Sequence, residues 1–398
     1  GRWTRTPGLA RAPRRFAADE LAYLRTENPL GESAPKTITE LDPAEGEAGG
    51  LEFHPGGLDD FFWQYDATGG RFHVLKAERG CLDLVRVEGE EHVRLTDGGH
   101  DFWSLEVGGD RAVLQGSGQT LPGGIFTVDL GGDGPVTPEL VIDPNEEWRR
   151  QVELIEPERF EIEVEGRAIE GWFFKPLGLH EGERVPVVLS IHGGPQWMYG
   201  GYFLPEFHIL PRYGFGVVIA NPTGSMGYGT EFMKGVRFDW VDRPARELMA
   251  CLDYAVELGW ADPDRMAVMG GSYGGHLGAA LTTQSDRFGA AALDRMFPEP
   301  VAFWGTTDEK WFPEWEFGGK PWEPEALEIY RRNSPWEKVD RVNTPTLVSH
   351  GMRDYRCLVA GAEMWFSALR SRGVPARLIR FETEGHGIRD PRNIVFYN

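Results

Sequence analysis

The stretch AVMGGSYGGHLGAAL, residues 267–281, places one serine between two pairs of glycines. Small and apolar residues suited to a buried strand precede Ser272, and a run with helical character follows it. Gly270–Gly274 match the pattern G-x-S-x-G, in which the serine stands on a sharp turn from strand to helix with its hydroxyl exposed. Glycines give the neighbouring backbone room for that turn. The stretch predicts an α/β fold with a reactive serine at the sheet edge; a glycine-rich turn that only packs closely is the alternative.

On both sides of this turn, short apolar runs typical of buried strands alternate with helical runs. The strand-like runs are PVVLSIH (186–192), FGVVIANP (215–222), RMAVMGG (265–271), AALD (291–294), TPTLVSH (344–350) and ARLIRFE (376–382), and the helical runs include 243–259 and 360–373. Such alternation predicts a parallel sheet covered by helices on both faces. We expect this domain to span residues 151–398 and to begin with the hairpin at 159–176.

The first 150 residues carry a different pattern, that of short strands separated by glycine turns. FWQYDATGGRFHVLKAERG begins at Phe62 and FWSLEVGGDRAVLQGSG begins at Phe102, an offset of 40 residues (102 − 62). A strand–turn–strand run follows each copy, and a weaker third copy covers 15–27. A four-stranded unit repeating about every 40 residues is typical of a β-propeller blade.

Residues 1–150 are therefore predicted to form an all-β, propeller-like domain, with unrelated hairpins as the alternative. A closed propeller needs about four blades or more, and only two to three fit in this length. The propeller is thus expected to be incomplete: either blades lie outside the given chain, or the sheets pack on something else.

A serine hydroxyl needs a base to take its proton, and the base needs an acid to fix its tautomer. In sheets of this kind the three residues follow in the order Ser, Asp, His. LVSHGMRDYR ends one strand and presents Asp354, and LIRFETEGHG ends the next and presents His386, the only histidine after that aspartate. We expect Ser272, Asp354 and His386 to be the catalytic residues. The competitors are His350 as base, and Glu384 and Asp390 as acids.

A tetrahedral intermediate carries a negative oxygen, which needs hydrogen-bond donors. The backbone N–H of Tyr273, directly after the serine, is one expected donor. SIHGGPQWMYG, residues 190–200, follows an early strand, and its run His192–Pro195 keeps the backbone exposed. The N–H of Gly194 is the other expected donor, with an ordinary turn as the alternative.

Composition excludes several classes of partner. Sixty-two acidic residues against 41 basic ones give a net charge of −21, which repels phosphate backbones, so we expect no nucleic acid partner. No apolar run approaches the roughly 18 residues of a membrane helix, so we expect no membrane partner. H-E-x-x-H and dinucleotide fingerprints do not occur, and GSMGYG (224–229) lacks the lysine of a P-loop. We therefore expect no metal and no cofactor.

The three cysteines, Cys81, Cys251 and Cys357, are widely spaced and form no disulfide framework. This usage favours a reducing compartment and hence a cytoplasmic location. The chain begins at Gly1 rather than at methionine, so removal of a leader would leave a periplasmic or secreted location open.

Several of these motifs, together with ANPTGSMGYGTEF (220–232), FWGTTDEKWFPEWEFGG (303–319) and ALRSRGVPARLIRF (368–381), run in the order of one enzyme family. The chain resembles the prolyl oligopeptidase family of serine peptidases over most of 160–398. It is most similar to the branch of acylaminoacyl peptidases and bacterial dipeptidyl peptidases. The resemblance implies an α/β-hydrolase domain beside a β-propeller, with the catalytic residues and oxyanion donors named above.

The resemblance also implies residues that bind substrate. Arg356, two positions after the aspartate, would hold a main-chain carbonyl of the substrate, with a structural salt bridge as the alternative. A fixed guanidinium fork suits that task. The aromatic segment 303–317 would border the pocket for the side chain on the acyl side of the cut. Trp304, Trp311 and Phe312 are its expected walls, although core packing explains such residues equally well.

The leading functional hypothesis is a serine peptidase that hydrolyses short peptides through an acyl-enzyme intermediate. An esterase on the same scaffold is the second hypothesis, because the three catalytic residues serve any acyl group. A catalytically inactive binding protein is the third. The oligomeric state, including a homo-oligomer, stays open.

Overall fold

The computed structural model describes residues 9–17, 20–26, 36–41, 52–53, 62–68, 71–88 and 91–397. The chain separates into two compact units. The first contains residues 1–154 and the short segments 200–204 and 226–233, and the second contains 155–199, 205–225 and 234–398. The domain limits predicted from the sequence, 1–150 and 151–398, stay a prediction.

The first unit contains three four-stranded antiparallel sheets, and in each one the strands lie side by side in chain order. The first sheet is β1 (Leu9–Ala17), β2 (Glu20–Thr26), β3 (Lys36–Leu41) and β4 (Glu52–Phe53). The second is β5 (Phe62–Thr68), β6 (Arg71–Glu78), β7 (Cys81–Glu88) and β8 (Glu91–Arg94). The third is β9 (Asp101–Gly108), β10 (Arg111–Gly118), β11 (Leu121–Asp129) and β12 (Glu139–Ile142), which the short helix α1 (Glu146–Arg149) follows.

The predicted four-stranded repeat is confirmed in the second and third sheets, because β5 begins at Phe62 and β9 at Asp101. This strand order is that of a propeller blade. The weaker third copy, 15–27, falls on β1 and β2, while its residues 18, 19 and 27 lie outside the described part of the chain.

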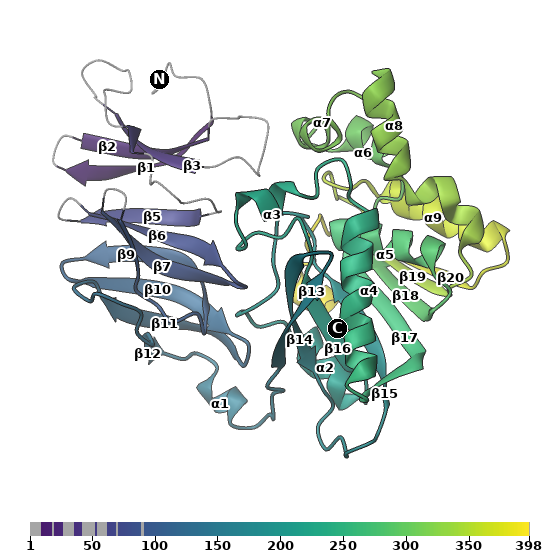
Figure 1. Ribbon diagram of the computed structural model, residues 1–398, viewed down its shortest axis with the longest axis horizontal. Coiled ribbons are helices and arrows are strands. Elements are labelled where there is room, and N and C mark those ends of the chain that lie inside the picture. Colours follow the sequence, from purple (N-terminus) through teal and green to yellow (C-terminus); the bar gives the residue numbers. More distant parts are fainter. Residues whose placement is uncertain are drawn as a thin grey trace. The chain divides into compact units, whose positions relative to one another are not determined.

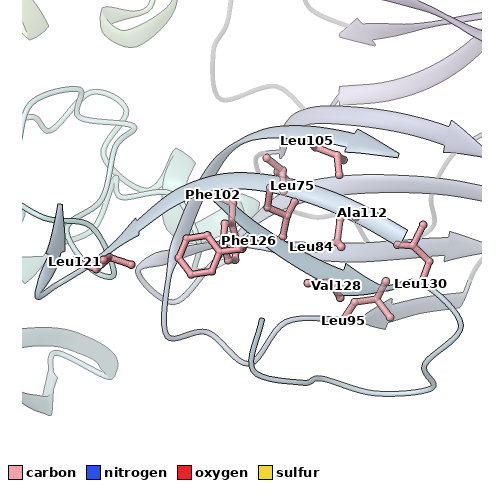
Figure 2. Close-up of a cluster of buried hydrophobic side chains, with 11 residues drawn as sticks. Leu75, Leu84, Leu95, Phe102, Leu105, Ala112, Leu121, Phe126, Val128 and Leu130 are labelled. Carbon is pink, nitrogen blue, oxygen red and sulfur yellow. The ribbon is translucent and has the colours of Figure 1, made fainter. Parts of the chain in front are cut away.

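An apolar core joins the second and third sheets (Figure 2). Leu75 and Leu84 of the second sheet are fully buried against Phe102, Leu105 and Phe126 of the third. The rings of Phe102 and Phe126 meet edge to face, with centroids 5.3 Å apart. Leu75 and Leu84 are direct partners across β6 and β7 and therefore share one face of the second sheet. In β9 a register irregularity lies between Phe102 and Ser104, and both Phe102 and Leu105 belong to this core.

The two short segments of the first unit that come from later in the chain are joined to its strands by backbone hydrogen bonds. The N–H of Gly201 donates to the carbonyl oxygen of Gly80 at 2.7 Å, and the N–H of Arg79 donates to that of Gly227 at 2.9 Å. A Cβ on Gly200 would lie 1.8 Å from the Gly80 oxygen, so only glycine fits there. The β6–β7 turn is therefore completed by residues more than 100 positions away.

The second unit is built on one eight-stranded sheet (Figure 1). In spatial order its strands are β13 (Glu158–Val164), β14 (Arg167–Phe174), β16 (Gly216–Asn221), β15 (Val185–Ile191), β17 (Ala261–Gly271), β18 (Phe288–Asp294), β19 (Thr346–Gly351) and β20 (Ala376–Phe381). The six strands from β16 to β20 are parallel, and β13 and β14 form an antiparallel edge. The fold class predicted from the sequence is confirmed.

Helices connect and cover these strands. They are α2 (Glu206–Arg212), α4 (Asp242–Glu257), α5 (Tyr273–Gln284), α6 (Pro300–Thr306), α7 (Trp311–Phe317), α8 (Pro324–Arg332), a 3-10 helix (Pro335–Arg341), α9 (Val359–Ser371) and α10 (Pro391–Tyr397). A further short helix, α3 (Thr230–Lys234), falls almost entirely in the segment 226–233 that belongs to the first unit. The buried residues of α4 include Leu248, Cys251, Leu252 and Ala255, a spacing of three and four that makes one apolar face. Across the described residues, no helix has the length and apolar character needed to cross a bilayer.

Candidate active site

Ser272 stands between the end of β17 and the start of α5, with φ 60° and ψ −123°. A positive φ is strained for a residue with a side chain, so surrounding contacts must hold it. Two backbone hydrogen bonds do so: the Ser272 N–H donates to Asp294 O, and its carbonyl accepts from His276 N–H, each at 3.0 Å. The sharp strand-to-helix turn predicted from the sequence is therefore present.

Close approach of the backbone explains the four glycines around this serine. A Cβ on Gly274 would lie 2.1 Å from the carbonyl oxygen of Ile191, and one on Gly270 would lie 2.7 Å from the Gly274 carbonyl carbon. A Cβ on Gly271 or Gly275 would lie 2.7 Å from the Arg295 guanidinium or the Met296 side chain, respectively. The end of β15, the residues after β18 and the start of α5 thus lie close around the turn at these four glycine positions.

The structure brings the three predicted catalytic residues together. His386 Nε2 lies 3.1 Å from Ser272 Oγ, and His386 Nδ1 lies 2.8 Å from Asp354 Oδ2. Asp354 follows β19 and His386 follows β20, so both side chains come from the carboxyl ends of parallel strands. Asp354 is almost fully buried, at 1% exposure, whereas the His386 side chain is 32% exposed. The arrangement leaves the serine and the imidazole accessible from one side.

Asp354 is surrounded by hydrogen-bond donors. Its Oδ1 accepts from the backbone N–H groups of Arg356 and Cys357, each at 2.9 Å. Its Oδ2 faces His386 and also lies 3.3 Å from Nε2 of the fully buried His350. Burial raises the pKa of Asp354, but the hydrogen bonds from His350 and His386 outweigh burial and hold this pKa below its usual range. The carboxylate is therefore ionised at neutral pH and can orient the imidazole.

The competing residues occupy supporting positions. His350 donates from Nε2 to the Cys357 carbonyl oxygen at 2.6 Å, so it holds the loop that carries Asp354. Glu384 accepts hydrogen bonds from the backbone N–H groups of Arg389 and Asp390, inside the loop after β20. Asp390 pairs with Arg392 at 2.8 Å.

The loop that contains Gly194, whose N–H is an expected oxyanion donor, lies against the serine. A Cβ on Gly193 would be 3.4 Å from Ser272 Cβ, and Gly194 has φ 115° before a cis bond to Pro195. His192 secures the start of the loop, with Nδ1 2.7 Å from Gly193 O and Nε2 2.9 Å from Ser225 Oγ. Burial lowers the pKa of His192 to about 4, so this imidazole is neutral at pH 7.

Tyr273, the second expected donor residue, is the first residue of α5. The N–H groups in the first turn of a helix have no carbonyl partner within the helix. They also lie at the positive end of the helix dipole. The Tyr273 N–H is therefore available to an anionic oxygen bonded to Ser272.

Arg356 forms ion pairs with two acidic residues that precede α7. Its Nε lies 2.7 Å from Asp308 Oδ1, and its Nη2 lies 2.8 Å from Glu309 Oε1. The guanidinium is 37% exposed, so these pairs leave it partly open to solvent. The structure therefore contains the salt bridge foreseen as the alternative, and it holds Arg356 in one orientation.

The three expected wall residues have different surroundings. Phe312 is buried, and its ring lies 5.5 Å from that of Trp240, which in turn lies 5.5 Å from the Tyr273 ring. Trp311 packs against Phe312 at 5.9 Å. Trp304 packs edge-on against Trp322 instead and donates to Glu314 Oε1 at 3.0 Å. Phe312 is thus connected by packing to the residue beside the serine, and the contacts of Trp304 lie elsewhere in the segment.

Two buried polar residues near the site were not indicated by any sequence pattern. Gln196, in the loop after Gly194, donates to Glu316 of α7 at 3.0 Å across 120 positions of the chain. Local sequence periodicity does not indicate a pair of residues so far apart in the chain. Groups of three or more side chains able to hold a metal ion are absent from the described residues.

Comparisons with known proteins agree with this geometry. Residues 202–398 match the prolyl oligopeptidase family (Peptidase_S9). An uncharacterized peptidase of Bacillus subtilis, YuxL, is 30% identical over 346 residues, 85% of this chain and 50% of the relative. Dipeptidyl-peptidase 5 of Porphyromonas endodontalis is 27% identical over 81% of this chain and 47% of its own length. The chain spans about half the length of these two relatives.

A solved structure is similar over most of the chain. The uncomplexed acylaminoacyl peptidase of Pyrococcus horikoshii superposes with a TM-score of 0.82 and is 25% identical. The match covers 92% of this chain and 58% of the other. The similarity therefore extends over both the all-β and the α/β parts.

Proposed function

Because residues 202–398 belong to the prolyl oligopeptidase family, we propose that this chain is a serine peptidase that hydrolyses short peptides through an acyl-enzyme. The observation that carries the proposal is the continuous hydrogen-bonded path from Ser272 through His386 to Asp354, at 3.1 and 2.8 Å. These distances are within the range for proton transfer from a nucleophile to its base.

The proposed mechanism begins with attack of Ser272 Oγ on the scissile carbonyl carbon, while His386 Nε2 takes the hydroxyl proton. Asp354 holds the imidazole by Nδ1 and stabilises its positive charge. The N–H groups of Gly194 and Tyr273 receive the negative oxygen. His386 then passes its proton to the leaving amine, and water, activated by the same imidazole, releases the acyl group.

We propose that Arg356 binds a main-chain carbonyl of the peptide on the acyl side of the cut. Its pairing with Asp308 and Glu309 supports this role, because it fixes the guanidinium before substrate arrives. We propose Trp311 and Phe312, and with weaker structural support Trp304, as walls for the adjoining side chain. The relatives are named for two modes, acylaminoacyl and dipeptidyl peptidases, and we extend to this chain only the class of short peptides.

The proposal predicts that Ser272→Ala loses at least about 1,000-fold in kcat/KM on peptide p-nitroanilides. The wild-type chain should also react covalently with a fluorophosphonate probe, and the variant should not. Circular dichroism spectra of the two proteins serve as the folding control. Wild-type turnover by Ser272→Ala would contradict the proposal.

The same assay separates a peptidase from an esterase. A peptidase that uses Arg356 should lose amide hydrolysis in Arg356→Ala while retaining hydrolysis of small esters that lack the carbonyl. Cleavage of paired free and N-acetylated peptides, read by mass spectrometry, then identifies the acylaminoacyl or dipeptidyl mode. Ester turnover with no peptide cleavage would favour the esterase.

We further propose the cytoplasm as the compartment of this protein. Cys81, Cys251 and Cys357 are all free thiols and all buried, which suits a reducing environment. Localisation of a tagged full-length protein tests this assignment.

A further inference from the structure

A buried carboxylate lies between the two segments that carry the proposed oxyanion donors. Glu316, on α7, has no solvent exposure. Its Oε1 accepts a hydrogen bond from Gln196 Nε2, and its Oε2 accepts one from Trp240 Nε1, each at 3.0 Å. A buried carboxyl group needs hydrogen-bond partners in place of water, because a buried polar group without them costs free energy.

Gln196, the first hydrogen-bond partner of Glu316, connects this side chain to the loop that contains Gly194. Gln196 is two residues beyond Gly194 and is itself buried, at 5% exposure. The two backbones are in close contact, since a Cβ on Gly194 would lie 2.5 Å from Gln196 N. The Gln196 side-chain oxygen has no hydrogen-bond partner among the described residues, so the bond to Glu316 is what holds this side chain.

Trp240, the second hydrogen-bond partner of Glu316, connects this side chain to Tyr273. The Trp240 indole donates to Glu316, and the Trp240 carbonyl oxygen accepts from the Tyr273 hydroxyl at 2.8 Å. The Trp240 and Tyr273 rings also meet nearly at right angles, with centroids 5.5 Å apart. The Tyr273 side chain is thus attached to the same carboxylate through one intermediate residue.

We propose that Glu316 is a positioning residue that sets the spacing between the two oxyanion donors, by holding the Gly194 loop through Gln196 and Tyr273 through Trp240. This inference rests on the proposed function. A carboxyl group suits the task because its two oxygens accept from the Gln196 amide and the Trp240 indole at once. Donors displaced by a fraction of an ångström stabilise the transition state less while leaving substrate binding intact.

The test compares Glu316→Met, which removes both acceptor oxygens, with Glu170→Met, a matched control. Glu170, on β14, also carries a buried carboxyl group, at 1% exposure, and pairs with Arg159 on β13. We expect Glu316→Met to lower kcat for a peptide p-nitroanilide about 10- to 100-fold with KM within about twofold. A peptide aldehyde, which forms a tetrahedral adduct with the serine, should lose affinity by a similar factor. The affinity for the cleaved peptide product should not change, and Glu170→Met should change none of these quantities.

Gln196→Met supplies a second, independent variant in case Glu316→Met folds poorly. It should also lower kcat and aldehyde affinity. The double variant should be no worse than Glu316→Met alone, because that substitution already removes the connection to Gln196. Unchanged kcat and aldehyde affinity in folded variants would overturn the inference, as would equal losses of aldehyde and product affinity. A wild-type chain that neither hydrolyses peptides nor reacts with fluorophosphonate would instead overturn the proposed function, and this inference with it.

Discussion

At the scale of single residues, the candidate site depends on side chains fixed before any substrate binds. Ser272 is held at φ 60°, and Asp354 accepts four hydrogen bonds or close polar contacts from the backbone and from two histidines. The meeting of Ser272, His386 and Asp354 could be predicted from the sequence, because each follows a recognisable strand end in a fixed chain order. The support from His350 and Glu316 could not, because a buried polar contact leaves no periodic pattern.

One prediction at this scale concerns Asp354→Asn. The new amide would present an N–H to His386 Nδ1 and so favour the tautomer that carries its proton on Nε2, which cannot accept the serine proton. We expect kcat on a peptide p-nitroanilide to fall about 10,000-fold. Asp390→Asn, in the acid paired with Arg392, should keep at least half of the wild-type kcat. An inactive Asp390→Asn together with an active Asp354→Asn would contradict the assignment of Asp354 as the acid that orients His386.

At the scale of elements, the candidate site depends on the close packing of β15, β17 and α5 around Ser272. The glycine pairs, the alternation of strands and helices and the two carboxyl-terminal strand ends were all readable because they are local. The position of β14, antiparallel to β16 and between it and the edge strand β13, was not, because strand order depends on pairing between distant segments. The ion pairs of Arg356 with Asp308 and Glu309 were foreseen only as an unspecified salt bridge, for the same reason.

Gly274→Ala tests the close packing at the turn. Its Cβ would lie 2.1 Å from Ile191 O, a backbone atom that can move only with β15. We expect a destabilisation of about 3 kcal/mol, seen by calorimetry as a lower temperature of the transition that contains the α/β unit. The rate of fluorophosphonate labelling should fall as well, since α5 begins at the serine.

The control is Gly305→Ala, near the end of α6, where an added Cβ meets nothing within 4 Å. This change should be neutral or stabilising by up to about 1 kcal/mol. Equal effects of the two substitutions would show that glycine flexibility, rather than steric room, matters at residue 274.

At the scale of the whole molecule, the first unit contains a pair of buried carboxylates outside the site. Asp83 is fully buried and bonds to Thr96 Oγ1 and to Arg94 Nη2, at 2.6 and 2.7 Å, and burial raises its pKa to about 6. Burial also raises the pKa of Asp101 to about 7; the hydrogen bond from Leu82 N–H opposes this rise and the charge of Asp83 adds to it. Both carboxyls thus bind protons more tightly in the folded chain than in the unfolded one.

The sign of the resulting pH dependence follows from linkage. Between about pH 4 and pH 7 the folded state holds protons that the unfolded state has released, so stability rises as pH falls through this window. The slope is at most about 1.4 kcal/mol per pH unit for each group. Calorimetry from pH 8 to pH 5 should show a transition temperature of the first unit that increases on acidification, and Asp101→Asn should flatten this increase. A flat wild-type profile would contradict the two raised pKa values.

The hydrogen bonds of Gly201 and Gly227 with the β6–β7 turn also bear on how the gene can be divided. A fragment that starts at residue 155 would retain 200–204 and 226–233 but lose the strands that receive them. The first of these segments comes directly after the loop that includes Gly194, so in this fragment the residues that follow that loop would lose their hydrogen-bond partners. Expressed alone, residues 155–398 should therefore have a lower kcat/KM than the whole chain. Addition of residues 1–154 as a separate chain should restore part of the lost kcat/KM.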